Sequence, residues 1–240
     1  MRSLVPDEGK APVLGGNEEL TQAGFGRMTW SVDQMRYETL TKAEEDPTGT
    51  AALLLDAAEE VFAEHGYGAA STREIARRAR VPFGALHYHW GSKQQLRQAV
   101  HARAIERFKD TIGRGLAVGH TGGAAIDTLV DAFVDLLIAN RNLVRLLYRS
   151  TIEPLDKTIE AMIIEFWRFG LGVFQRLGIE LPLDNPASLL VISHLFVACV
   201  VDEPGQRLAL GDSVFHSPNA RDRLCVELRR VARMVFQVKE

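Results

Sequence analysis

The side chains best suited to chemistry in this sequence are concentrated in residues 71–93, which read STREIARRARVPFGALHYHWGSK. The stretch brings together hydroxyl groups, arginines, histidines and aromatic rings, which proteins use to contact phosphates and base edges. Its pattern is that of two short helices separated by a tight break, an arrangement that presents one helix to the major groove of DNA. We therefore interpret this stretch as the candidate DNA-contacting site.

Three short helices within residues 48–93 are predicted to position this site. The first starts at Thr48 or Thr50, after Pro47, and stops at Gly66, because glycine readily adopts the left-handed conformation that ends helices. The second starts at Ser71 or Thr72. Ser71-x-x-Glu74 has the spacing of a capping box, in which each side chain satisfies a free backbone N–H group.

The third helix, residues 83–90, is the one predicted to enter the major groove. Pro82 separates it from the second helix, because proline lacks an N–H donor and disfavours helix in the residue before it. Gly91 ends the third helix. Ser92-x-x-Gln95 then has the spacing of another capping box, which predicts the start of a fourth helix.

The run TAALLLDAAEEVFAEHGYGAASTREIARRARVPFGALHYHWGSKQQL, residues 50–96, resembles the DNA-binding domain of the TetR family of bacterial transcription regulators. Four motifs follow in the family's order: a D-A-A…F-x-x-x-G helix, a T-x-x-x-I-A helix, a V-x-x-G-x-L-x-x-H-[FW] recognition helix and an S-K pair opening the fourth helix. The resemblance implies an all-α homodimer. A three-helix helix-turn-helix DNA-binding domain would be followed by a larger helical domain for ligand binding and dimerisation.

The family's DNA contacts fall on three groups of residues in this sequence: Thr72 and Arg73 at the start of the second helix, Phe83, Gly84, Ala85, His87, Tyr88 and His89 on the third, and Lys93 beyond it. A hydroxyl, free backbone N–H groups and a guanidinium suit phosphate or guanine. The side chains of Phe83, Gly84 and Ala85 cannot hydrogen-bond to bases. We therefore expect apolar contacts there, for example with thymine methyl groups.

The sequence departs from the family pattern at positions close to these contacts. Pro82 replaces a small polar residue, and Phe83 replaces a polar or basic one. His87 stands where tyrosine is common, and Arg80 occupies a turn position that is often glycine. These departures leave the preferred DNA sequence open.

Structural roles compete with DNA contact on the third helix. Leu86 and Trp90 are expected in the small core of the three helices, whereas Tyr88 is compatible with either role. His87-x-His89 superficially resembles a metal-binding pair, but residues two apart on a helix point in different directions. We therefore predict no metal site here.

The composition limits the remaining classes of protein. A chain of 240 residues with 46% hydrophobic side chains can bury a sizeable core, and long apolar stretches with helical spacing favour an all-α fold. Cys199 and Cys225 lie in helical patterns and not in a disulfide framework, which suits the cytoplasm. No uncharged apolar stretch is long enough to predict a membrane span. We expect a cytoplasmic protein that does not enter membranes.

The sequence offers no arrangement for catalysis. It has no glycine-rich phosphate loop, no nucleophile elbow and no metal-ligand spacing. His194, Cys199 and Asp202 are close in sequence, but their offsets on a helix do not bring the thiol against the imidazole. We therefore predict that the protein is not an enzyme and has no catalytic residue, metal or cofactor.

Composition and motifs divide the chain into three segments. Residues 1–47 are a largely flexible extension in which residues 31–45 can form a helix; its net charge of −4 argues against a minor-groove arm. Residues 48–93 are the helix-turn-helix domain, and residues 94–240 are the regulatory and dimerisation domain. Three methionines are candidate starts of the chain: Met1, Met28 and Met35.

Apolar periodicity and glycine or proline breaks predict six helices in the third segment. They are expected at residues 92–112, 124–139, 142–150 and 155–177, from 185 onward, and at 221–238. Residues 113–123 read as a glycine-rich break and residues 202–218 as an irregular loop. The resemblance implies that the last two long helices form the homodimer interface.

Aromatic, sulfur-containing and polar residues on these helices are candidates for a small-molecule effector site: Phe133, Tyr148, Met162, Phe166, Trp167, Phe169, His194 and Phe196. Their apolar balance favours a hydrophobic or amphipathic ligand. The function predicted is a ligand-responsive repressor that leaves a palindromic double-stranded DNA operator when it binds this effector. The alternative is a helical adaptor that keeps the helix-turn-helix fold without sequence-specific DNA binding.

Overall fold

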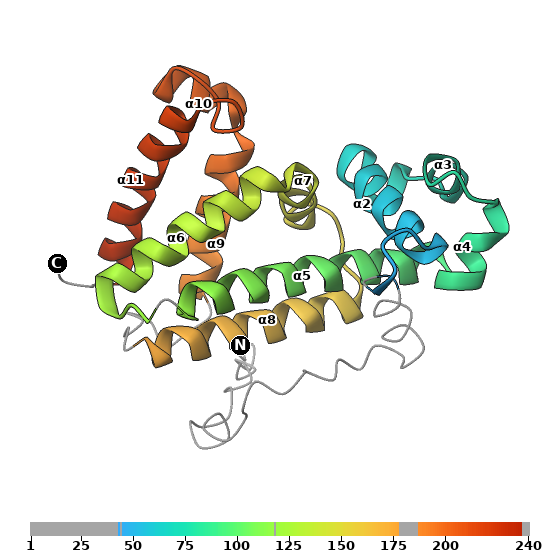
Figure 1. Cartoon of the computed structure of the whole chain (residues 1–240), viewed down its shortest axis with the longest axis horizontal. Helices are drawn as coiled ribbons and strands as arrows, with labels where there is room; N and C mark the ends of the chain where they lie inside the picture. Colours follow the sequence, from blue (N-terminus) through green and yellow to red (C-terminus); the bar gives the residue numbers. More distant parts are fainter. Residues whose placement is uncertain (1–42, 44, 118, 178–186, 237–240) are drawn as a thin grey trace, which may run out of the picture. The chain divides into compact units, whose positions relative to one another are not determined.

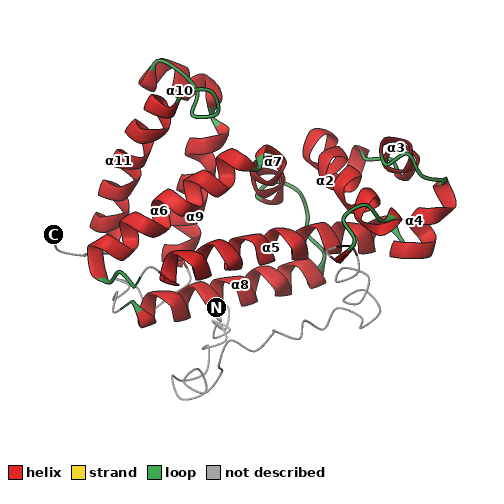
Figure 2. Cartoon of the chain, in the orientation of Figure 1, coloured by secondary structure: helices red, strands yellow, loops and turns green. Residues whose placement is uncertain are grey.

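The computed structural model describes residues 43, 45–117, 119–177 and 187–236. Within these ranges every regular element is a helix, so the predicted all-α class is confirmed (Figure 2). The predicted extension 1–47 lies outside the described residues except for Ala43 and residues 45–47, and so does most of the helix expected at 31–45.

Ten helices follow one another in the described ranges (Figure 1): α2 (Thr50–Ala69), α3 (Thr72–Arg78), α4 (Phe83–Trp90), α5 (Lys93–Ala117), α6 (Gly122–Ala139), α7 (Arg141–Ser150), α8 (Lys157–Arg176), α9 (Ala187–Val201), α10 (Glu203–Leu210) and α11 (Pro218–Val235). Helix α5 runs alongside α8, and α7 packs against α2.

Helices α2, α3 and α4 form the small core predicted around the third helix. Leu86 and Trp90 of α4 are buried, together with Leu54 of α2 and Ile75 of α3. The indole Nε1–H of Trp90 donates a hydrogen bond to the carbonyl of Ala51 at 3.2 Å. This bond satisfies the polar group of the buried ring and connects the end of α4 to the start of α2.

The capping box predicted at Ser71 is wrong, whereas Ser92 does cap its helix. Ser71 is the N-cap of α3, but its side chain makes no capping hydrogen bond. The Glu74 carboxylate accepts hydrogen bonds from Arg77 at 2.7 and 2.8 Å, because these guanidinium donors lie one turn away. Ser92 Oγ accepts from the backbone N–H of Gln95 at 3.2 Å.

Three residues of this region have a left-handed backbone: Gly66, Arg80 and Gly91. Gly66 has φ +77° and interrupts α2 as predicted, although a last helical turn continues to Ala69. Arg80 has φ +57° at the turn between α3 and α4, where the family pattern favours glycine. A side chain at this φ is disfavoured, so the structure explains why Arg80 is unusual there.

Helix α5 continues beyond the predicted end at residue 112, through Gly113 and Gly115. A Cβ atom at Gly115 would lie 3.2 Å from Leu129 Cδ2 of α6. Glycine therefore allows α5 and α6 to approach closely here and does not end the helix. The predicted glycine-rich break is shortened to the segment between Ala117 and Gly122.

The loop predicted at residues 202–218 contains the helix α10, which the sequence analysis missed. Asp202 is its N-cap, and Oδ1 accepts from the backbone N–H of Gly205 at 3.0 Å. Behind it, the buried Gln206 donates to the carbonyl of Cys199 at 2.7 Å and accepts from the N–H of Val214 at 2.9 Å. These bonds connect α10 to the end of α9 and to the segment that leads into α11.

Three aspartates spaced four residues apart on α6 connect it to α11. Asp127, Asp131 and Asp135 share one face of the helix because of this spacing. They bind Arg233 at 2.5 Å, Arg229 at 2.7 Å and Arg221 at 2.9 Å respectively. The pairing order shows that the two helices run antiparallel, and it holds α11 along α6.

Candidate DNA interface and internal cavity

Helix α4 has one buried and one exposed face. Leu86 and Trp90 point into the core, whereas the Tyr88 side chain is 86% exposed and Phe83 is 45% exposed. Gly84 and His87 are also exposed, and Ala85 and His89 are half-buried. The predicted DNA contacts of this helix therefore lie mainly on the face that a groove can reach.

Phe83 lies between side chains from two helices. The guanidinium carbon of Arg73 lies 5.9 Å from the centroid of the Phe83 ring, and the His87 ring meets the same ring edge-on at 5.6 Å. Cation–π and edge-to-face contacts of this kind stabilise a fixed arrangement. Phe83 thus positions Arg73, at the start of α3, beside the exposed face of α4.

The hydrogen bonding of His87 defines what its ring can offer a base. His87 Nδ1 lies 2.9 Å from the carbonyl oxygen of Gly91, which can only accept, so Nδ1 carries the proton. In the neutral ring, Nε2 is then an acceptor. It could accept from the amino group of adenine or cytosine in the major groove.

Two of the three arginines of α3 are paired with carboxylates of the same chain. Arg77 is paired with Glu74 at 2.7 Å, and Arg78 with Glu64 at 2.8 Å. The hydrogen bond from Arg77 lowers the pKa of Glu74. Among the residues that the structure describes, Arg73 and Arg80 have no acidic partner, so these two remain available to a phosphate or a base.

Lys93, predicted to contact the DNA backbone, lies against the end of α2. Its Nζ is 4.4 Å from the centroid of the Tyr67 ring and donates to the carbonyl of Gly68 at 3.5 Å. Burial and the nearby charge of Arg97 lower the pKa of Lys93. The phosphate contact of Lys93 stays a prediction, and Lys93 also has a packing role.

Helix α5 belongs both to the three-helix core and to the rest of the chain. Near its start, the guanidinium carbon of Arg97 lies 4.4 Å from the Tyr67 ring centroid, and its Nη1 donates to the carbonyl of Pro154 at 3.1 Å. Six residues further along α5, Arg103 binds the buried Glu59 of α2 at 2.5 Å. A displacement of α5 would therefore be transmitted to α2.

Helix α7 holds the other side of α2. Arg149 donates to the carbonyls of Ala63 at 3.0 Å and Glu64 at 2.8 Å, next to the break at Gly66. The Glu153 carboxylate, just beyond α7, accepts from the backbone N–H of Tyr67 at 3.1 Å. These bonds satisfy backbone groups at the end of α2, and they connect the three-helix region α2–α4 to α7.

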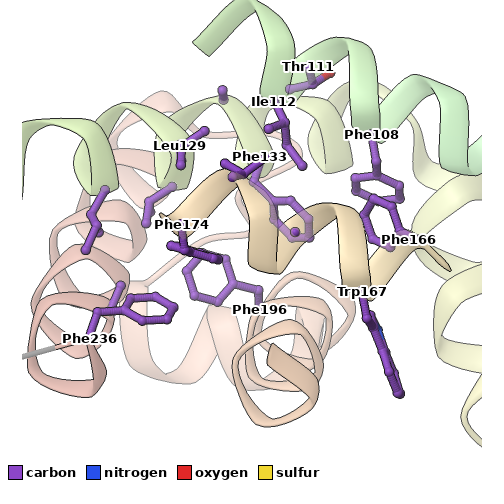
Figure 3. Close-up of a pocket in the computed structure, with 16 residues that line it drawn as sticks. Phe108, Thr111, Ile112, Leu129, Phe133, Phe166, Trp167, Phe174, Phe196 and Phe236 are labelled. Carbon is purple, nitrogen blue, oxygen red and sulfur yellow. The ribbon is translucent and has the colours of Figure 1, made fainter. Parts of the chain in front are cut away.

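A cavity of about 150 Å³ lies between α5, α6, α8, α9 and α11 (Figure 3). Phe133, Phe166, Trp167 and Phe196 of the predicted effector residues line it. In Figure 3 the Phe133, Phe166 and Phe196 rings gather together, and Trp167 points away from them at one side. The structure therefore brings four of the predicted residues to one cavity.

The other four predicted effector residues do not line this cavity. Tyr148 is 45% exposed on α7, and Met162 is buried in the core. Phe169 stacks on Phe166 with 6.5 Å between ring centroids, behind the lining. His194 lies on an exposed part of α9.

Lining residues on α5, α6, the last part of α8 and α11, and Phe236 beyond α11, were not predicted from the sequence. Phe108 of α5 stacks with Phe133 with 5.2 Å between ring centroids, and the ring centroids of Phe174 and Phe236 are 4.6 Å apart. The available signal was the helical spacing of Phe108, Thr111 and Ile112, which places them on one face. Because the rest of this helix is highly charged, the sequence did not predict that this face lines a cavity.

The residues considered for catalysis do not form a reactive group. Burial raises the pKa of the Cys199 thiol, while Asp202 is used as the cap of α10. In the described part of the chain, no three His, Cys, Asp or Glu side chains are arranged to hold a metal ion. Among the helices described, none has the length and apolar content needed to cross a bilayer.

Comparisons with known proteins agree with this arrangement. Residues 54–100 match the family model described as bacterial regulatory proteins, tetR family. The chain is 34% identical to an HTH-type transcriptional repressor of Mycobacterium tuberculosis, over 62% of this chain and 94% of that protein. It is 47% identical to the A-factor receptor protein of Streptomyces griseus, over 20% of this chain and 17% of the receptor.

Solved structures show the same fold at low sequence identity. The fatty acid degradation regulator FadR from Bacillus halodurans superposes with a TM-score of 0.59 at 18% identity, covering 75% of this chain and 96% of that one. A tetR-family regulatory protein from Rhodococcus RHA1 superposes with a TM-score of 0.58 at 24% identity, covering 80% and 98%.

Proposed function

The chain belongs to the TetR family of bacterial regulatory proteins and is a DNA-binding transcription regulator, and we propose that it acts as a homodimeric repressor released from a palindromic operator by a small apolar effector. The observation that carries the proposal is the single helix α5, which starts at the DNA-contacting helices and lines the cavity with Phe108, Thr111 and Ile112.

The proposed DNA-binding surface is the exposed face of α4 with the start of α3. Arg73, His87 and Tyr88 supply the polar groups, and Phe83, Gly84 and Ala85 allow close apolar approach. Thr72 and His89 complete this surface, and Lys93 adds a backbone contact beyond it. Contacts to phosphates set the position of the helix, and contacts to base edges set sequence preference.

The proposed dimer forms through α9 and α11. Both helices expose apolar side chains that a partner would cover: Val191 (61%), Leu195 (36%), Val226 (56%) and Met234 (63%). A two-fold axis there would present two copies of α4 to successive major grooves, roughly 34–36 Å apart or somewhat more. A palindromic operator matches that symmetry.

The proposed mechanism of release uses the connection between the cavity and the DNA-binding helices. An effector bound against Phe108 shifts α5, and the contacts from α5 to Glu59 and Tyr67 transmit the shift to α2. The two copies of α4 then no longer fit both half-sites at once. Effector and operator binding are thereby coupled, and each weakens the other.

Binding to the DNA upstream of its own gene, measured by fluorescence anisotropy at about 100 mM salt because affinity depends on salt, tests the function. We expect Arg73→Ala to weaken binding at least tenfold, and Arg145→Ala, an exposed arginine on α7, to leave it unchanged. Equal binding of operator and random DNA would favour the adaptor alternative. Equal operator affinity with and without a saturating effector would remove the mechanism of release.

A protein with this function acts where the chromosome is, which places it in the cytoplasm. No catalytic activity is part of the proposal, since burial raises the pKa of the Cys199 thiol and Asp202 caps α10. The repressor named among the relatives supports repression over activation.

A further inference from the structure

The chemical character of the cavity lining is unusually uniform. Sixteen residues line the cavity, and Thr111 and Trp167 are the two that carry a polar side-chain atom. The Thr111 hydroxyl already donates to the carbonyl of Arg107 at 2.9 Å and accepts from Arg114 at 3.1 Å. Among the described residues that line the cavity, none is charged and none is suited to hold an ionised group.

The cations nearest in sequence to the lining are used elsewhere. Lys109, Arg168 and Arg233 each follow a lining residue directly, but they pair with Glu106 at 2.6 Å, with Glu165, and with Asp127 at 2.5 Å respectively. A carboxylate buried in the cavity would therefore lose its hydration without gaining a partner. Burial of an unpaired charge costs several kcal/mol or more.

The size of the cavity suits one ring better than a long chain. A volume of about 150 Å³ is the volume of an engineered apolar cavity that stays dry and binds benzene. The lining presents both faces and edges of rings: Phe108 and Phe133 stack at 5.2 Å, and Phe196 meets Phe133 at 80°. Aromatic ligands pack well in such surroundings, through offset stacking and edge-to-face contacts.

We propose that this cavity binds a neutral single-ring aromatic molecule, of the size of ethylbenzene, and excludes ionised aromatic acids. The inference rests on the proposed function and names the chemical class of its effector. The ring lies among Phe108, Phe133 and Phe196, so it contacts α5, α6 and α9 together. Because charged molecules are excluded, the protein responds to a neutral aromatic compound but not to the corresponding aromatic carboxylate.

Isothermal titration of the full-length protein with a matched set of probes tests the inference. Nitrobenzene and benzoate have the same shape but differ in charge, whereas ethylbenzene and decanoate contrast a neutral ring with an ionised acyl chain. We expect ethylbenzene and nitrobenzene to bind, and benzoate to bind at least 100-fold more weakly, a difference of about 2.7 kcal/mol. Benzoate binding as tightly as nitrobenzene, or decanoate binding more tightly than ethylbenzene, would overturn the proposal.

A pair of variants on α6 places the binding in this cavity. Ala132 lines the cavity, whereas Ala124 is exposed on the same helix and does not. Ala132→Leu should fill part of the cavity and weaken ethylbenzene binding at least tenfold, and Ala124→Leu should not change it. If a folded Ala132→Leu protein bound ethylbenzene like the wild type, the cavity would not be the site. The comparison of probes on the wild type decides the ligand class even if this variant does not fold.

Operator binding by the same preparation without any probe keeps the two proposals separate. If the operator is bound and the neutral aromatics are not, the ligand class is wrong while the regulator stands. If the neutral aromatics bind and the operator is not bound, the proposed function is wrong while the ligand class stands.

Discussion

Replacing Glu59 with glutamine should loosen the attachment of the DNA-binding helices to α5. The Glu59 side chain lies between two arginines of α5 and is largely buried: Arg103 donates to Oε2 at 2.5 Å and Arg107 to Oε1 at 3.0 Å. Glutamine keeps the size of the side chain but removes its charge. Both guanidinium groups then lose the carboxylate that they share.

The expected loss of stability depends on the partners and solvent contact that each arginine keeps after the substitution. Removing one partner of a buried ion pair costs about 3–5 kcal/mol. Arg103 keeps Asp56 at 2.6 Å, and Arg107 has 34% of its side chain exposed. We therefore expect a loss of about 2–3 kcal/mol in the free energy of unfolding. That corresponds to a fall in Tm of about 4–12 °C, since 1 kcal/mol shifts a chain of this size by about 2–4 °C.

Urea and thermal unfolding followed by circular dichroism at neutral pH measure this loss. The matched control is Glu106→Gln on the same helix, because Glu106 pairs with Lys109 and has 42% of its side chain exposed. An exposed pair contributes about 1 kcal/mol or less. If Glu59→Gln cost no more than Glu106→Gln, the reasoning that this buried ion pair holds α2 against α5 would be refuted.

Three further predictions concern Lys93 and Phe83 at the proposed DNA interface and His101 on α5. Lys93→Ala should weaken binding to all DNA sequences and lower the salt slope by about 1, whereas Phe83→Ala should change the preferred bases; equal effects on specific and random DNA would remove Phe83 from the reading surface. Desolvation lowers the pKa of His101, beside Arg97, Asp156 and Glu153. Folding therefore favours the neutral His101 ring, and stability should fall as the pH drops below the unfolded pKa of about 6.5. Urea midpoints at pH 7.5 and 5.5 should differ less in His101→Gln, and an unchanged difference would contradict this.

Local patterns predicted the three-helix region well because its signals are short-range. Pro82 separates α3 from α4, Gly66 has the left-handed backbone expected of it, and Leu86 and Trp90 are buried. The capping box failed because its spacing says nothing about competing partners, and Arg77 lies within reach of the Glu74 carboxylate.

Contacts between helices that are distant in sequence determined features that local sequence patterns did not predict. Gly115 read as a helix break, but the contact with Leu129 makes glycine the residue that lets α5 pass close to α6. The helix α10 carried a usable signal, since Asp202 is followed by acidic and proline residues in the first turn. Its surroundings contain few apolar residues at helical spacing, so it read as a loop.

Only part of the cavity lining was predicted, because the lining also depends on contacts between helices that are distant in sequence. Composition identified aromatic residues on the right helices, but periodicity alone does not say which helix faces which. Phe166 and Phe169 lie three residues apart on α8, yet only Phe166 lines the cavity. Trp167 lines it from the adjacent position. Their different places depend on the neighbours of α8, and these follow from the fold.

Selection of binding sites from a random DNA library by the purified wild-type protein tests the central claim most directly. The account predicts enrichment of an inverted repeat whose half-site centres are about one helical turn apart or somewhat more. It also predicts that the Arg73→Ala protein fails to enrich that repeat. Recovery of no sequence above the starting library, or of a single unrepeated site, would contradict a dimeric regulator that reads DNA with α4.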